Sequence, residues 1–175
     1  TKQPTTAGEV TFGVDLTGFS TRVTQDGSSW NDGDKIGTYV LDMKTLEPVT
    51  EAANVPYVCS EEGASVSFTS TTPVKFVAYY PYNADVRNFN YPVQLAAQER
   101  GSTACDLLYA ATKEEYTYSP ENEPHISLNF THRLAKVILK FVNMEKEPLE
   151  VSDVRIEGMQ TAASFNIQTD VLTVD

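Results

Sequence analysis

The sequence predicts an all-β sandwich of about seven or more strands with little helix. Apolar residues recur with a period of two along most of the chain, as they do in half-buried strands. Turn-forming clusters rich in Gly, Asn, Asp and Pro separate these runs at intervals of about ten residues. The 175 residues include 41% hydrophobic and 21% charged residues, a composition that supports one folded domain spanning 1–175.

The first predicted strand lies near the N-terminus. Val10, Phe12, Val14 and Leu16 alternate there with polar residues and glycine. Such alternation is typical of a strand with one buried face. Burying these four side chains contributes about 6–12 kcal/mol, whereas ordering the backbone of the segment costs about 8–16 kcal/mol. The two totals are comparable, so we expect this strand to be only marginally held by its own side chains.

The remaining predicted strands follow at regular spacing along the chain. They cover residues 36–43, 55–60, 65–69, 74–80, 91–95, 107–111, 125–131 and 149–157. The segment 134–141 fits a helical stripe as well as a strand, and its β-branched content and lack of a helix cap favour a strand. Between residues 83 and 103, a long loop with a short helical turn is expected around the strand at 91–95.

The charge balance excludes several classes of function. With 13 Lys and Arg against 24 Asp and Glu, the formal net charge is −11, so a nucleic-acid backbone would be repelled. No apolar run reaches the roughly 18–20 residues that a transmembrane helix needs. The chain is therefore not expected to bind nucleic acid or to be an integral membrane protein.

Motifs that carry catalysis, cofactors or metals are not found in the sequence. It has no nucleophile elbow, zinc-protease helix or phosphate-binding loop, which argues against an enzyme and against a cofactor. His125 and His132 lack the spacing of a metal pair, and the Asp32-Gly33-Asp34 cluster is better explained as a turn than as a calcium loop. Cys59 and Cys105 lie too far apart for a redox motif; two buried thiols are favoured over one disulfide.

One aromatic cluster invites a binding hypothesis. Tyr79, Tyr80 and Tyr82 surround Pro81 and offer a candidate stacking platform for glycans. Packing in the sandwich core and its loops is the simpler interpretation of the same residues. Glycan binding by a cell-surface lipoprotein domain is therefore the alternative function, and glycan arrays would distinguish it from a purely structural role.

Five phrases in the sequence resemble the fimbrillin-like family, whose members are subunits of type V pili in Gram-negative anaerobes. The phrases are Ser20-Thr21-Arg22, Trp30-Asn31-Asp32-Gly33-Asp34-Lys35-Ile36-Gly37, Phe76-Val77-Ala78-Tyr79-Tyr80-Pro81-Tyr82, Asp106-Leu107-Leu108-Tyr109-Ala110, and Leu128-Asn129-Phe130-Thr131-His132-Arg133-Leu134-Ala135-Lys136. The segment 161–166 also resembles the close of the family's N-terminal domain. Each phrase is weak alone, but five in the same order make the resemblance specific over roughly residues 20–140.

The resemblance implies a fold and a biological setting. The fold is a transthyretin-like Greek-key sandwich, and a second sandwich is expected after residue 175. The function is that of a structural subunit or adhesin of a surface fimbrium at the outer membrane, with other pilus subunits as partners and a host or glycan receptor as a further candidate. The precursor is expected to be lipid-anchored.

The resemblance also implies how subunits assemble. The N-terminal strand carrying Val10, Phe12, Val14 and Leu16 is the element exchanged for a neighbour's strand. Arg22 corresponds to the family's processing point for an arginine-specific protease, although an ordinary exposed arginine in a connection fits equally well. Cutting there would remove the strand and open a groove that another strand can fill.

Overall fold

The computed structural model describes residues 9–15, 30, 33–49, 53–59, 65–67, 70–96, 105–118 and 125–174. Over these ranges the chain is built from strands, and none of the described residues lies in an α-helix. The strands are β1 Glu9–Asp15, β2 Lys35–Asp42, β3 Val55–Val58, β4 Ser65–Ser67, β5 Val74–Tyr80, β6 Asn90–Gln94, β7 Leu108–Ala111, β8 His125–Asn129, β9 Thr131–His132, β10 Ala162–Asn166 and β11 Val171–Val174. The all-β prediction is confirmed.

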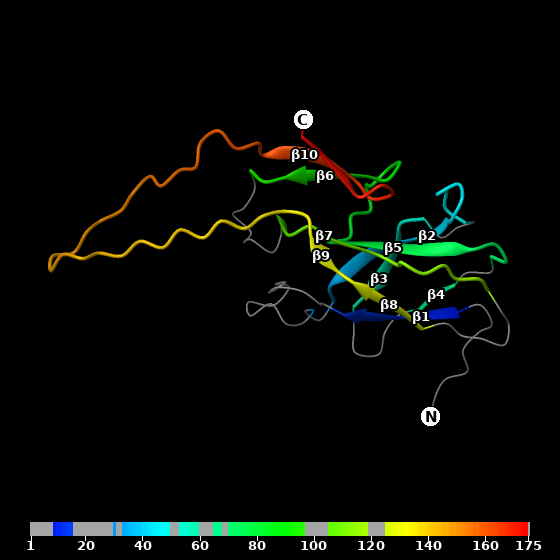
Figure 1. Ribbon diagram of the computed structural model, residues 1–175. Coiled ribbons are helices and arrows are strands. Elements are labelled where there is room, and N and C mark those ends of the chain that lie inside the picture. The colour runs from blue at the N-terminus through cyan, green and yellow to red at the C-terminus, as the bar shows by residue number, and fades with distance from the viewer. Residues whose placement is uncertain are drawn as a thin grey trace, which may run out of the picture.

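The strands form three sheets stacked in layers (Figure 1). Sheet A has the order β4-β1-β8, sheet B the order β3-β2-β5-β7-β9, and sheet C the order β11-β10-β6. Sheet B is antiparallel throughout, and it lies between the other two sheets. The transthyretin-like Greek-key connectivity stays a prediction.

Sheet B has a hydrophobic core on each of its faces. Phe76 and Ala78 of β5 pack with Ile126 and Leu128 of β8 in the core between sheets A and B. Val77 of the same strand belongs to the second core, between sheets B and C. Residues of both parities along β5 are therefore buried, which explains why Val74–Tyr80 reads as a nearly continuous apolar run.

The packing of a tyrosine ring over sheet B depends on a glycine. Gly37 of β2 lies opposite Tyr79 of β5, and a Cβ atom built on Gly37 would lie 2.2 Å from Cε1 of that ring. The tyrosine ring thus occupies the space that any other residue at position 37 would need. The Tyr79 hydroxyl donates a 2.6 Å hydrogen bond to Oδ1 of Asn54, which fixes the ring in this position.

Two predicted strands are wrong. The segments 134–141 and 149–157 form no strand, and residues 135–161, here called the arm, leave the sandwich as an extended excursion (Figure 1). Their local sequence favours a strand, but in this structure neither segment lies against a partner with which to form a ladder. The sequence analysis also missed two strands, β10 and β11.

Candidate functional site

The N-terminal strand is the central strand of sheet A. Along β1, Thr11 is paired antiparallel with Ser65 of β4 and parallel with His125 of β8. Backbone hydrogen bonds therefore reach β1 from both of its edges. Because a strand in this position completes two ladders, its loss would leave unpaired N–H and C=O groups on both neighbours.

The register of β1 follows the buried face of β8. Phe12 is level with Ile126, and Val14 is level with Leu128. Ile126 and Leu128 are both buried in the core between sheets A and B. The alternation seen in the sequence thus coincides with the alternation of β8 at the register positions that the backbone defines. Leu16 and Arg22 lie outside the described residues.

The core between sheets A and B, on which β8 packs, ends in an aromatic cluster. Phe130, fully buried between β8 and β9, meets the Trp30 ring edge-to-face at a centroid distance of 5.4 Å. Trp30 also contacts the ring of Tyr80 at 5.3 Å, and the Tyr80 hydroxyl donates a 3.1 Å hydrogen bond to Oδ1 of Asp34. Burial, with the nearby Asp34 charge, raises the pKa of Tyr80. These contacts tie sheet A to sheet B.

The three tyrosines considered for glycan stacking do not share an open surface. Tyr79 is 0% exposed in the core between sheets B and C, and Tyr80 is 8% exposed in the core on the opposite face. Tyr82 is half-buried and packs against the cluster of Tyr79. A sugar needs an accessible ring face, so this geometry agrees with the packing interpretation.

The candidate metal and redox residues are dispersed. Cys59 and Cys105 are both free; Cys59 is buried, whereas Cys105 is half-buried. Burial raises the pKa of the Cys59 thiol to about 12, so this thiol stays protonated and unreactive. His132 Nδ1 lies 2.6 Å from Oδ1 of Asp106, and within the described ranges no three His, Cys, Asp or Glu side chains gather to hold a metal ion.

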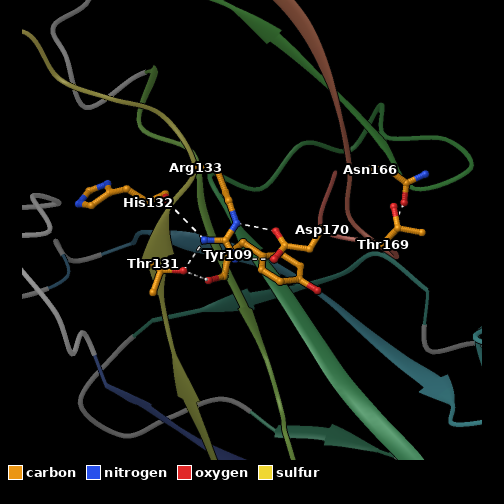
Figure 2. Close-up of polar contacts among 7 residues, drawn as sticks. All are labelled: Tyr109, Thr131, His132, Arg133, Asn166, Thr169 and Asp170. Atoms are coloured by element: carbon orange, nitrogen blue, oxygen red, sulfur yellow. Dashed lines mark hydrogen bonds and ion pairs between the residues drawn. The ribbon is translucent and has the colours of Figure 1, made fainter. Parts of the chain in front are cut away.

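A polar clasp that the sequence analysis did not identify joins the end of sheet B to sheet C (Figure 2). The Arg133 guanidinium donates to both carboxylate oxygens of Asp170, through Nε at 2.5 Å and through Nη2 at 2.7 Å. The guanidinium carbon also lies 4.9 Å from the centre of the Tyr109 ring. Arg133 follows β9, and Asp170 lies in the turn between β10 and β11, so one side chain fixes that turn against the central sheet.

A family model described as fimbrillin-like matches residues 21–175, which is most of the chain. This chain belongs to the fimbrillin-like family. The resemblance carried by the five sequence phrases is thereby confirmed. A search of curated proteins finds no match.

Two solved structures share the fold of this fimbrillin-like chain. One is a candidate cell adhesion protein from Bacteroides uniformis, with a TM-score of 0.58 and 24% sequence identity, covering 99% of this chain and 68% of that chain. The other is a candidate cell adhesion protein from Bacteroides ovatus, with a TM-score of 0.63 and 17% identity, covering 96% of this chain and 67% of that chain. At these identities the likeness shows the fold alone.

Nothing in the described part of this fimbrillin-like chain resembles a membrane-spanning helix. The described strands and their loops instead build the three layers and the arm.

We expect Arg133→Ala to lower the free energy of unfolding by about 1–2 kcal/mol, because a forked, partly buried ion pair and a ring contact are lost. Arg133→Lys should recover less than half of this, since an ammonium cannot bind both oxygens in a fork. Urea unfolding measures both. Arg155→Ala is the matched control: its ion pair with Asp153 is exposed, so a change within about 0.5 kcal/mol is expected. Equal losses at the two arginines would contradict the clasp.

We expect the folded state to lose stability above pH 10. Burial raises the pKa of Tyr39, Tyr91 and Tyr109 to about 12, from an ordinary value of 10.0. Between pH 10 and about 12 the unfolded chain releases these protons while the folded chain retains them, so the free energy of unfolding falls as pH rises. Urea unfolding across this range measures the fall, and Tyr109→Phe should make it shallower. A flat profile would refute the expectation.

Proposed function

We propose that this chain is a structural subunit or adhesin of a bacterial surface fimbrium that joins related subunits by β-strand exchange. Membership of the fimbrillin-like family supports a role in a fimbrium or in adhesion. We further propose that residues 1–175 form one sandwich domain, and that the mature protein acts at the cell surface, at the outer membrane, after lipid anchoring of its precursor.

The observation that carries this proposal is the position of β1 between β4 and β8. A strand at a sheet edge could leave with one ladder broken, but β1 belongs to two ladders. A replacement strand would therefore be guided by both neighbours. The same alternation of apolar residues at positions 10, 12 and 14 would be required of the strand that enters.

The release step requires a cut between β1 and the rest of the fold. Arg22 follows β1 in the chain and remains the proposed processing point. Trypsin-like cleavage there would break the covalent link between the strand that carries Val10, Phe12 and Val14 and the rest of sheets A and B. The free energy gained by burying this strand and the cost of ordering it are comparable. After cleavage, another strand can therefore compete with it for the same position.

Limited digestion of the folded protein with an arginine-specific protease tests the first step. We expect N-terminal sequencing to find cleavage after Arg22 before cleavage at Arg87 or Arg133, both of which are held by hydrogen bonds in the structure. An Arg22→Gln variant is the control and should keep its N-terminal segment under the same conditions. Persistence of an intact Arg22 while Arg87 or Arg133 is cut would defeat the proposed processing.

A peptide-binding experiment tests the second step. A fluorescent peptide of residues 9–17 should bind the cleaved protein after its own N-terminal segment has been removed, and should not bind the uncut protein. The matched control peptide carries Phe12→Asp and Val14→Asp, which remove the apolar alternation, and should not bind. Equal binding of both peptides would show that the groove does not select a strand. Electron microscopy of the cleaved full-length protein would then show whether filaments form.

A further inference from the structure

The arm exposes an unusual amount of apolar surface. Figure 1 shows it leaving β9, turning at a distant tip and returning to β10. Phe141 is 60% exposed and Met144, at the tip, is 87% exposed. The other exposed large apolar side chains of the arm are Val137, Ile138, Leu139, Val142, Leu149, Val151, Val154, Ile156 and Met159. Exposed apolar residues in such a concentration mark a segment that makes further contacts.

The tip of the arm already has the geometry of a tight turn. Nδ2 of Asn143 donates a 2.7 Å hydrogen bond to the backbone oxygen of Glu147. The other side-chain atom of the same amide, Oδ1, accepts a 2.8 Å hydrogen bond from the backbone N–H of Glu145. These contacts hold Asn143 opposite Glu147 across a short connection, which is a common loop length in β-hairpins. The tip therefore defines a register for the two legs of the arm.

Extending this register along the legs gives favourable cross-strand pairs. Phe141 falls opposite Leu149, and Leu139 falls opposite Val151. Between these two apolar pairs, Lys140 falls opposite Glu150. Apolar pairs and opposite charges in directly facing positions both stabilise antiparallel strands. Pro148, which has no N–H, sits next to the turn, where a strand tolerates proline.

A change of phase in the returning leg coincides with an unusual backbone conformation. The apolar residues Leu149 and Val151 occupy odd positions, whereas Val154 and Ile156 occupy even positions. Asp153 lies between the two pairs and has φ = 53°, in the left-handed region that few non-glycine residues adopt. One extra residue in a strand, accommodated as a β-bulge, produces such a switch of face.

With a bulge at Ser152 and Asp153, the second half of the arm also pairs favourably. Val154 then falls opposite Val137, and Ile156 falls opposite Ala135, so the apolar face continues without interruption. Lys136 falls opposite Arg155, and the two diagonal neighbours of Lys136 are then Asp153 and Glu157, which offset the like charges.

We propose that the two legs of the arm, residues 135–142 and 148–157, pair with each other as a bulged antiparallel β-hairpin. Closure joins backbone groups that the open arm leaves without a ladder. It also gathers the apolar residues at positions 135, 137, 139 and 141 of the first leg with those at 149, 151, 154 and 156 of the second leg on one face, whereas Ile138 and Val142 fall on the other face. The partner strand of each leg is therefore the other leg of the same molecule.

Disulfide trapping tests the register of the hairpin. Lys140→Cys with Glu150→Cys places two thiols in facing positions, in a Cys105→Ser background. Facing residues have Cα atoms within the range that a disulfide can bridge. The matched control is Lys136→Cys with Glu150→Cys, which makes the same types of substitution but offsets the thiols by about 13 Å along the strand, four residues at about 3.3 Å each.

Mild oxidation should close the 140–150 pair within one molecule at least about ten times faster than the 136–150 pair, because only the first satisfies disulfide geometry. Peptide mapping after proteolysis identifies the bond, and non-reducing gels separate monomers from dimers. Three outcomes would overturn the proposal: equal rates for the two pairs, no bond in either, or bonds that link two molecules. The last outcome would show that arms pair between copies of the chain.

Charge reversal provides a second measurement in the protein with its native cysteines. Lys140→Glu should speed amide hydrogen exchange in both legs, since two carboxylates then face each other. Lys140→Glu with Glu150→Lys should restore the slower exchange. If exchange in the arm is fast in all three proteins, the legs do not pair.

Discussion

Gly37→Ala should lower the free energy of unfolding by about 1–3 kcal/mol, towards the upper end of that range. The added methyl would lie 2.2 Å from Cε1 and 2.4 Å from Cζ of Tyr79. The ring cannot easily move aside, because its hydroxyl is bonded to Asn54 and to the backbone of Asn83, and its edge packs on Tyr91. Urea unfolding monitored by tryptophan fluorescence measures the loss.

Two further variants separate this clash from an effect of the backbone. Gly33→Ala introduces the same methyl where no atom lies within 4 Å, so only the positive φ of 83° opposes it, at about 1 kcal/mol. In a Tyr79→Leu background the additional effect of Gly37→Ala should shrink, because the obstructing ring is gone. An undiminished effect in that background would show that Tyr79 is not the obstacle.

Phe130→Ala should lower the free energy of unfolding by about 3–5 kcal/mol, because a fully buried aromatic ring is replaced by a cavity. Phe130 lies between β8 and β9 and belongs to the core between sheets A and B. Its loss should weaken sheet A in particular. Hydrogen exchange should therefore speed up most in β1, β4 and β8.

Phe165→Ala is the matched comparison for this prediction. Phe165 is also fully buried, but it packs edge-to-face on Tyr109 in the core between sheets B and C. A similar global loss of stability is expected, with the fastest exchange now in β6, β10 and β11. The same pattern of exchange in both variants would show that the two cores do not act separately.

The strands of the central sheet could be predicted from sequence because their signal is local. The segment 74–80 coincides with β5, and 36–43 differs from β2 by one residue at each end. β-branched and aromatic residues bounded by turn clusters suffice to locate such strands. The burial of both faces of sheet B was not foreseen, because it depends on which sheets stack on it.

The missed and wrong strands have different origins. β10 carries a usable signal, since Ala163, Phe165 and Ile167 alternate with polar residues and are buried. The segments 134–141 and 149–157 have strong strand propensity, but propensity does not supply a partner strand. Whether such a segment forms a ladder is decided by tertiary contacts that a local window cannot contain.

The candidate site was only partly accessible from sequence. The alternation at residues 10, 12 and 14 identified the strand, but its two neighbours in sheet A are distant in the chain and follow from the topology. The clasp of Arg133 and Asp170 joins residues 37 positions apart. Neither residue stands out locally, because an arginine and an aspartate in loops are ordinary surface residues.

The layered arrangement affects how such a sequence can diverge. The residues of β5 from Phe76 to Tyr80 are buried on both faces of the sheet, so almost any replacement there disturbs one core or the other, and selection should hold this part of the strand nearly constant. Outward positions of sheets A and C escape that restriction. Sequence variation would therefore accumulate on the outer sheets and in the loops, while the central sheet is preserved.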